Sequence, residues 1–236
     1  MLGCTLLAEV VSPQFFNLLL LISMRSSFGI ILLILSVFCM SSLFANDVFE
    51  KDMAAYREVY LKAASGKPRA VRKAISGIRK LEKKYKNHPV ILAYRGGALS
   101  LRGISASNNG LDRMRETEEG LIVIDRALRK LPKHQGHYLE TVEAQLVAAF
   151  VFINIPNSMF HRLQEGNRLV EKLLAHQRFS EMPAGLQSAI YFAAATSAEK
   201  YIKPAEFKRY LELTVSADPD GKNGLEAKSL LQGMQD

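Results

Sequence analysis

The most informative absences in this 236-residue chain concern tryptophan and cysteine. There is no tryptophan, and the two cysteines, Cys4 and Cys39, both lie near the N-terminus. Residues 46–236 therefore contain no thiol, which excludes disulfides, thiolate nucleophiles and cysteine-ligated zinc from that part of the chain. A chain segment without cysteine is compatible with an oxidising compartment.

Sequence signatures of enzymes are also lacking. The chain has no HExxH pair, no G-x-S-x-G turn and no GxxxxGK[ST] loop. The glycine-rich segment RGGALSLRG, residues 95–103, lacks the lysine and the preceding strand that a phosphate-binding loop needs. We therefore expect a protein that is not an enzyme, with no catalytic residue, no metal ligand and no cofactor.

The five histidines do not form a recognised metal-binding pattern. They are His88, His134, His137, His161 and His176. His134 and His137 are close enough to share a helical turn, but they fall in a predicted connection without a cysteine or carboxylate at metal-ligand spacing. We interpret this pair as loop residues in solvent.

The first 45 residues carry only two charges, Glu9 and Arg25, and hold long apolar runs. From Met24 the sequence resembles a bacterial secretory signal peptide, because Arg25 precedes the apolar core at residues 28–40 and a short polar stretch. We expect cleavage after Ala45, with Met24 as a candidate start of translation.

An uncleaved membrane anchor is the alternative for this leader. Residues 28–44 are uncharged, and their number lies at the short limit for crossing a bilayer. With either outcome, residues 46–236 are expected to form the folded domain, exported to the periplasm or held at the membrane.

Basic residues exceed acidic residues, giving a net charge of +8. The leader holds one charge of each sign, so residues 46–236 keep the same excess. Basic residues are densest in residues 66–86 and 126–134. Within these runs they are interspersed with apolar residues at helical spacing, so we interpret them first as the solvated faces of amphipathic helices. The excess also suits anionic lipid, envelope polymers or acidic proteins as partners, whereas the expected export argues against nucleic acid.

Helix signals dominate residues 46–236, which have few alternating β-branched runs and are rich in alanine, leucine, glutamate, lysine and arginine. Proline and glycine clusters divide them into segments. The expected helical hairpins pair residues 47–64 with 68–86, 89–104 with 111–131, 135–155 with 159–178, and 183–201 with 204–217. A short helix over residues 224–234 is expected to cap the last hairpin.

One pattern recurs in the second helix of the first three hairpins. A small residue stands at Ala74, Gly120 and Gly166, each forty-six residues apart. Apolar or small residues follow four and seven positions later, at Ile78, Leu81, Ile124, Ala127, Val170 and Leu173. Positions with this spacing share one helix face, so we expect them to pack the repeat. In the preceding helix, Gly97 and Ala98 are expected to let two helix backbones approach closely.

The second unit of this pattern, with Gly120, Ile124, Ala127 and Pro132, matches the second helix of a tetratricopeptide repeat. Over residues 68–177 the chain resembles the tetratricopeptide-like family of helical-hairpin repeats, and more loosely small exported bacterial proteins of that type. The resemblance implies an all-α fold, a right-handed α-solenoid of about four hairpins with a short C-terminal capping helix. The repeat here is longer than the family's, which is about 34 residues.

The first helices of such stacks line a groove that binds an extended or helical peptide. The candidate partner-binding residues on those helices are Tyr94, Arg95, Arg102, Tyr138, Glu140 and Glu143. We therefore predict a non-enzymatic scaffold or adaptor of the bacterial envelope that binds a protein or peptide. Two alternatives stay open: a basic accessory protein that binds anionic lipid or cell-wall polymer, and a hydrolase or lyase with one catalytic carboxylate.

Overall fold

The computed structural model describes residues 48–64, 66–105 and 110–234. The chain divides into two compact units, Met1–Ala54 and Ala55–Asp236. In the first unit only residues 48–54 are described, and they are helical. The expected leader, with its cleavage point after Ala45, lies outside the described residues.

The second unit is built of helices, and the described residues include no β-strand, which confirms the all-α prediction. Helical residues 55–63 come first. They are followed by α2 (Pro68–Lys84), α3 (Pro89–Ser105), α4 (Gly110–Lys130), the 3₁₀ turn η1 (Leu131–Lys133), α5 (Tyr138–Asn154), α6 (Asn157–Phe160), α7 (Leu163–Leu174), the 3₁₀ turn η2 (Phe179–Glu181), α8 (Ala184–Lys200), α9 (Pro204–Ala217) and α10 (Lys222–Gln232).

Prolines and left-handed residues mark several helix ends. Pro68 and Pro204 occupy the first turns of α2 and α9, where the missing amide hydrogen leaves no helical bond unmade. Asn87, His161 and Ile202 have φ angles of 60°, 52° and 56°, a conformation that stops a helix. Local sequence therefore sets where these helices begin and end.

The third hairpin differs from the expected one in both of its helices. The first begins at Tyr138 rather than at residue 135, because the His137 side chain accepts a hydrogen bond of 3.4 Å from the amide of Leu139 and caps the helix. The second, expected over residues 159–178, is divided by left-handed His161 into α6 and α7.

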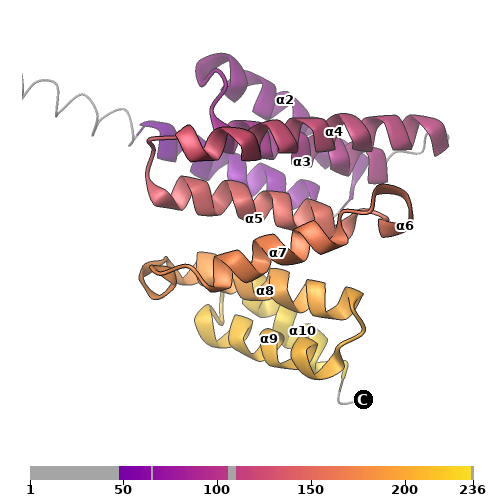
Figure 1. Ribbon diagram of the computed structural model, residues 1–236, viewed down its shortest axis with the longest axis vertical. Helices are drawn as coiled ribbons and strands as arrows, with labels where there is room; N and C mark the ends of the chain where they lie inside the picture. The colour runs from indigo at the N-terminus through magenta and orange to yellow at the C-terminus, as the bar shows by residue number, and fades with distance from the viewer. Residues whose placement is uncertain (1–47, 65, 106–109, 235–236) are drawn as a thin grey trace, which may run out of the picture. The chain divides into compact units, whose positions relative to one another are not determined.

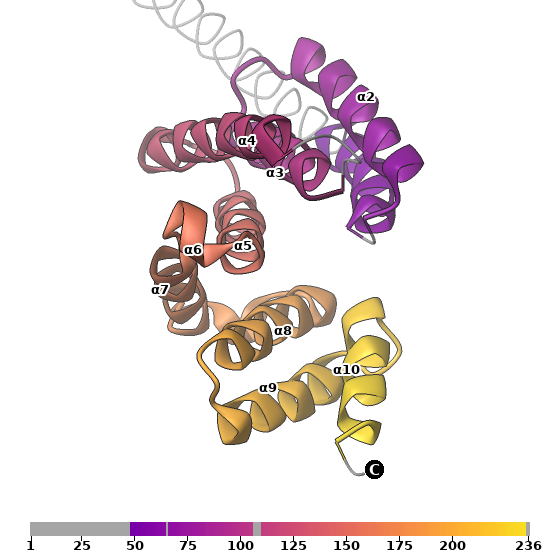
Figure 2. The same cartoon turned by 90° about the vertical axis from the view of Figure 1, so that its right-hand side faces the viewer.

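Each helix packs mainly on its neighbours in the chain. The principal pairs are α2 with α3, α3 with α4, α5 with α7, α8 with α9, and α9 with α10. Figures 1 and 2 show these helices following one another in chain order through the second unit. Helix α5 also contacts α3 and α8, and it is apolar on almost all sides, as a helix enclosed by others must be.

The residues that recur every forty-six positions fall on α2, α4 and α7 and share a buried face. Those that are buried are Ala74, Ile78, Gly120, Ile124, Ala127, Gly166, Val170 and Leu173. Leu81 is half-buried. The three helices thus bury equivalent positions in the same phase.

Helices α3 and α4 approach most closely at small residues. A Cβ atom placed on Gly96 would lie 2.6 Å from the Gly120 carbonyl oxygen, and one on Gly120 would lie 2.6 Å from the Gly96 oxygen and 2.7 Å from the Ser100 nitrogen. Further along α3, a Cβ on Gly103 would lie 2.9 Å from the Thr117 nitrogen. Because these neighbours are backbone atoms that cannot rotate away, the two helices can pack at this distance only with glycine here.

The sequence suggested Gly97 and Ala98 for a close contact between helix backbones. In the structure, these two residues pack against the first hairpin and not against α4. Gly97 faces the hydroxyl of Tyr60, which a Cβ atom would strike. Ala98 packs in a buried cluster with Ala63 and Val71. Both residues therefore face the first hairpin, whereas Gly96 faces α4.

Gly120→Ala tests the close approach of α3 and α4. The added methyl group would push against the Gly96 carbonyl and the Ser100 amide, so we expect the free energy of unfolding to fall by about 1–3 kcal/mol. Urea unfolding followed by far-ultraviolet circular dichroism measures this change.

Gly110→Ala, in the same helix, is the matched control. A Cβ atom there has no neighbour within 4 Å, so the variant should change the free energy of unfolding by less than about 0.5 kcal/mol. Equal effects of the two substitutions would show that α3 and α4 are not in close backbone contact.

Candidate functional site

Tyr94 and Glu143, two of the predicted partner-binding residues, meet inside the second unit. The Tyr94 hydroxyl donates a hydrogen bond of 2.7 Å to Glu143 Oε1. Arg57 donates to both oxygens of the same carboxylate, each at 2.6 Å. The Tyr94 ring packs edge-on against Tyr60 and Tyr56, with centroids 4.8 and 5.5 Å away. Burial, and then the Glu143 charge, raise the pKa of Tyr94 well above its usual value, so it remains a neutral donor.

Arg95 and Arg102 form ion pairs on the flanks of α3. Arg95 Nη1 lies 2.5 Å from Glu82 Oε1 on α2. Arg102 Nε lies 3.1 Å from Glu116 Oε1, and its Nη2 lies 3.6 Å from Glu119 Oε2, both on α4. Both arginine side chains remain about one-third exposed, so they join neighbouring helices and still reach solvent.

Tyr138 is half-buried beneath a cation. The guanidinium carbon of Arg178 lies 3.9 Å from the centroid of its ring, and His176 stacks on it at 5.8 Å. Arg178 in turn pairs with Glu181 at 2.7 Å. Each of these predicted residues thus has an intramolecular partner, and Tyr94 and Glu143 would have to break theirs to contact a ligand.

Glu140, the last predicted residue, lies between two histidines in the first turn of α5. Its Oε2 atom is 2.5 Å from His134 Nε2 and 3.2 Å from His88 Nε2, and its side chain is only 6% exposed. Burial acts to raise the pKa of Glu140, but the hydrogen bonds and charges of His88 and His134 outweigh it, and the pKa lies below its usual value. His134 is therefore not a solvated loop residue as the sequence suggested, whereas His137 is exposed.

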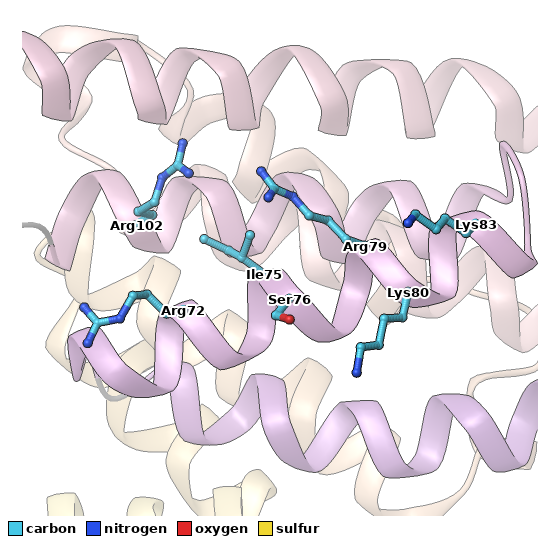
Figure 3. A pocket seen from close by; sticks show the side chains of 7 residues that line it. All are labelled: Arg72, Ile75, Ser76, Arg79, Lys80, Lys83 and Arg102. Carbon is cyan, nitrogen blue, oxygen red and sulfur yellow. The ribbon is translucent and has the colours of Figure 1, made fainter.

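A hollow of about 500 Å³ opens along α2. Five of the seven residues that line it are basic, and the full set is Arg72, Ile75, Ser76, Arg79, Lys80, Lys83 and Arg102. All but Arg102 belong to α2, where spacings of three and four residues bring side chains to neighbouring positions. Figure 3 shows the cationic groups spread along the helix rather than gathered at one point.

The cations of this hollow are poorly compensated. Arg72, Arg79, Lys80 and Lys83 are exposed, and within residues 48–64, 66–105 and 110–234 no carboxylate pairs with them. Helix α2 contains one acidic residue, Glu82, and none in its first turn, where the helix dipole favours negative charge. An anion lying across these side chains would relieve their mutual repulsion.

Sequence motifs do not indicate the histidine cluster, because its members lie far apart in the sequence. His88 precedes α3 and His134 precedes α5, so the two belong to connections between successive hairpins. They are forty-six residues apart, which is the spacing of the repeat. The two histidines therefore hold equivalent positions in successive repeats, and this is the sequence feature that could have predicted their contact.

Comparisons with protein-family models, with curated proteins and with solved structures found no match to this chain. Among the described residues no helix is both long enough and apolar enough to cross a membrane.

Tyr94→Phe tests whether the Tyr94–Glu143 contact stabilises the fold. Removing the hydroxyl deletes a hydrogen bond to a charged acceptor inside the protein, so the free energy of unfolding should fall by about 1–3 kcal/mol. Urea unfolding provides the measurement.

Tyr201→Phe serves as the control, because Tyr201 is 40% exposed, and it should change stability by less than about 0.5 kcal/mol. A Tyr94→Phe variant as stable as the wild type would return Tyr94 to the list of candidate ligand contacts.

Proposed function

We propose that this chain is a non-enzymatic, exported helical-repeat protein that binds an extended phosphate-bearing polyanion along α2. The observation that carries the proposal is the row of uncompensated cations around the hollow on that helix. It corresponds to the second of the functions considered from the sequence, a basic accessory protein for anionic lipid or cell-wall polymer.

The proposed architecture is a right-handed α-solenoid of tetratricopeptide-like hairpins. Two observations support it: the repeated positions bury the same face of α2, α4 and α7, and successive helices pack on their chain neighbours. Helix α10 fits the role of a terminal cap, because Ala227 packs against Ala195 and Leu211 while other residues of α10 face solvent.

The length of the cationic row favours an extended ligand. Arg72 and Lys83 are eleven residues apart, which corresponds to about 16 Å along a helix. A single phosphate ion cannot reach cations over that distance, whereas a chain of phosphates can contact several in succession. Arginine binds phosphate through two parallel N–H groups, and Arg72 and Arg79 both line the hollow.

The exposure and pairing of the side chains argue against the peptide-groove hypothesis. Its anchors Tyr94, Glu140 and Glu143 are buried or nearly so, and each is hydrogen-bonded within the protein. By contrast, the α2 cations are exposed and lack acidic partners among the described residues. The geometry therefore favours the basic hollow as the ligand site.

The cellular location follows from the leader expected over residues 1–45. A positive protein exported across the inner membrane meets phosphate groups in envelope polymers and in lipid headgroups. Envelope polymers and lipid headgroups would both present phosphate groups to α2, and experiment can distinguish them.

The double charge reversal Arg79→Glu plus Lys80→Glu tests the site. Each cation near a dense row of phosphates contributes about 1 kcal/mol, so the variant should bind long-chain polyphosphate at least about thirtyfold more weakly. Fluorescence anisotropy of labelled polyphosphate gives the affinities. Wild-type binding should also weaken as salt is added, because salt screens exposed charges.

Lys208→Glu plus Arg209→Glu is a matched control, since it reverses an adjacent, exposed basic pair on α9. This variant should retain nearly wild-type affinity for polyphosphate. Equal losses of affinity in both double variants would show that binding depends only on net charge, and the proposal would be wrong. Co-sedimentation with phosphatidylglycerol vesicles, compared with phosphatidylcholine vesicles, separates a lipid ligand from a soluble polymer.

A further inference from the structure

His88, His134 and Glu140 bring three potential metal ligands together at one place in the second unit. Their ligand atoms, two imidazole nitrogens and a carboxylate oxygen, all lie within 4.8 Å of one another. The side chains are 19%, 14% and 6% exposed, so solvent reaches the group only partly. The two imidazole rings meet edge to face at 81°, with centroids 4.9 Å apart.

Three separate segments hold these ligands. His88 ends the connection between α2 and α3, His134 follows η1, and Glu140 lies in the first turn of α5. The backbone fixes two of them: the amide of His134 donates to Leu131 O at 3.0 Å, and the carbonyl of His88 accepts from the amide of Leu92 at 3.0 Å. The ligand atoms therefore start from anchored backbone positions.

Gly136 lets the backbone pass close to the ligands. A Cβ atom at residue 136 would collide with both His134 Nε2 and Glu140 Oε2. Its φ angle is not in the left-handed region, so backbone conformation does not require glycine at this position. Glycine at this position therefore lets the backbone lie against the two ligand atoms without displacing them.

We propose that His88, His134 and Glu140 form a binding site for a divalent transition-metal ion of the zinc class, with water completing the coordination. Two imidazoles and one carboxylate are a donor set that suits Zn²⁺ in proteins, with a further position left for water. Imidazole nitrogen also selects against Mg²⁺ and Ca²⁺, which prefer oxygen ligands.

A bound ion would connect successive hairpins. His88 belongs to the connection that leads into α3, and Glu140 belongs to α5, so coordination ties the two helices at one end. Since the unfolded chain does not hold the three ligands together, binding to the folded protein raises its stability.

Zinc binding is tested on the full-length chain without a histidine tag, in a Cys4→Ser plus Cys39→Ser background that removes the two thiols. Equilibrium dialysis should find one tightly bound Zn²⁺ per chain, and the melting temperature should rise with Zn²⁺ but not with Mg²⁺. Co²⁺ in the same site should give visible absorption bands from nitrogen and oxygen ligation in a low-coordinate geometry.

His88→Ala and His134→Ala should each weaken Zn²⁺ binding by more than about tenfold, at least as much as the loss of a second-shell partner does. His137→Ala is the matched control, because His137 lies in the same connection as His134 but is exposed and outside the cluster. It should leave the affinity unchanged.

Gly136→Ala covers the case in which a histidine variant fails to fold. It retains all three donors, and the atoms it strikes are the movable ends of side chains, so the protein should fold with its ligands displaced and bind Zn²⁺ at least about tenfold more weakly. The proposal is wrong if the wild type binds no zinc, if His137→Ala loses as much affinity as His134→Ala, or if Gly136→Ala binds as tightly as the wild type.

Discussion

The backbone contact between α3 and α4 at Gly96 and Gly120 is the constraint on which both candidate sites depend. Because backbone atoms meet there without intervening side chains, α3 has little freedom to slide or rotate against α4. Helix α3 carries Arg102, which lines the basic hollow, and it begins directly after His88. A shift of α3 would therefore move a lining residue of one site and a ligand of the other, although the glycines contact neither site.

Much of the helix arrangement can be predicted from the sequence, because the residues that start, stop and orient each helix act within that helix. Prolines at Pro68 and Pro204 and the apolar spacing on α2, α4 and α7 act within one or two turns, and the helices begin and end near the positions they indicate. The division at His161 was not readable, since a left-handed histidine has no distinctive pattern. Gly96 rather than Gly97 makes the close contact because that choice depends on how α3 is rotated between two neighbours, which the helical period of α3 alone does not fix.

The candidate sites were harder to predict for a related reason. Composition shows how many charges the chain has but not which of them meet. Arg57 and Arg162 lie against the carboxylates of Glu143 and Asp125, each at 2.6 Å, whereas Arg79 has no acidic partner among the described residues. In the sequence all three arginines lie in segments that are expected to be helical. Only the packing of distant helices separates a cation that stabilises the fold from one that is available to a ligand.

The two sites are joined by the connection between α2 and α3. Lys83 lies at the C-terminal end of the basic row, and His88 lies only five residues further along the chain. A cation held by His88 would restrain this connection and add positive charge near the end of the row. By thermodynamic linkage, if a bound metal ion raised the affinity for the anion, a bound anion would raise the affinity for the metal ion by the same factor. The basic hollow on α2 and the histidine cluster thus share the connection between α2 and α3.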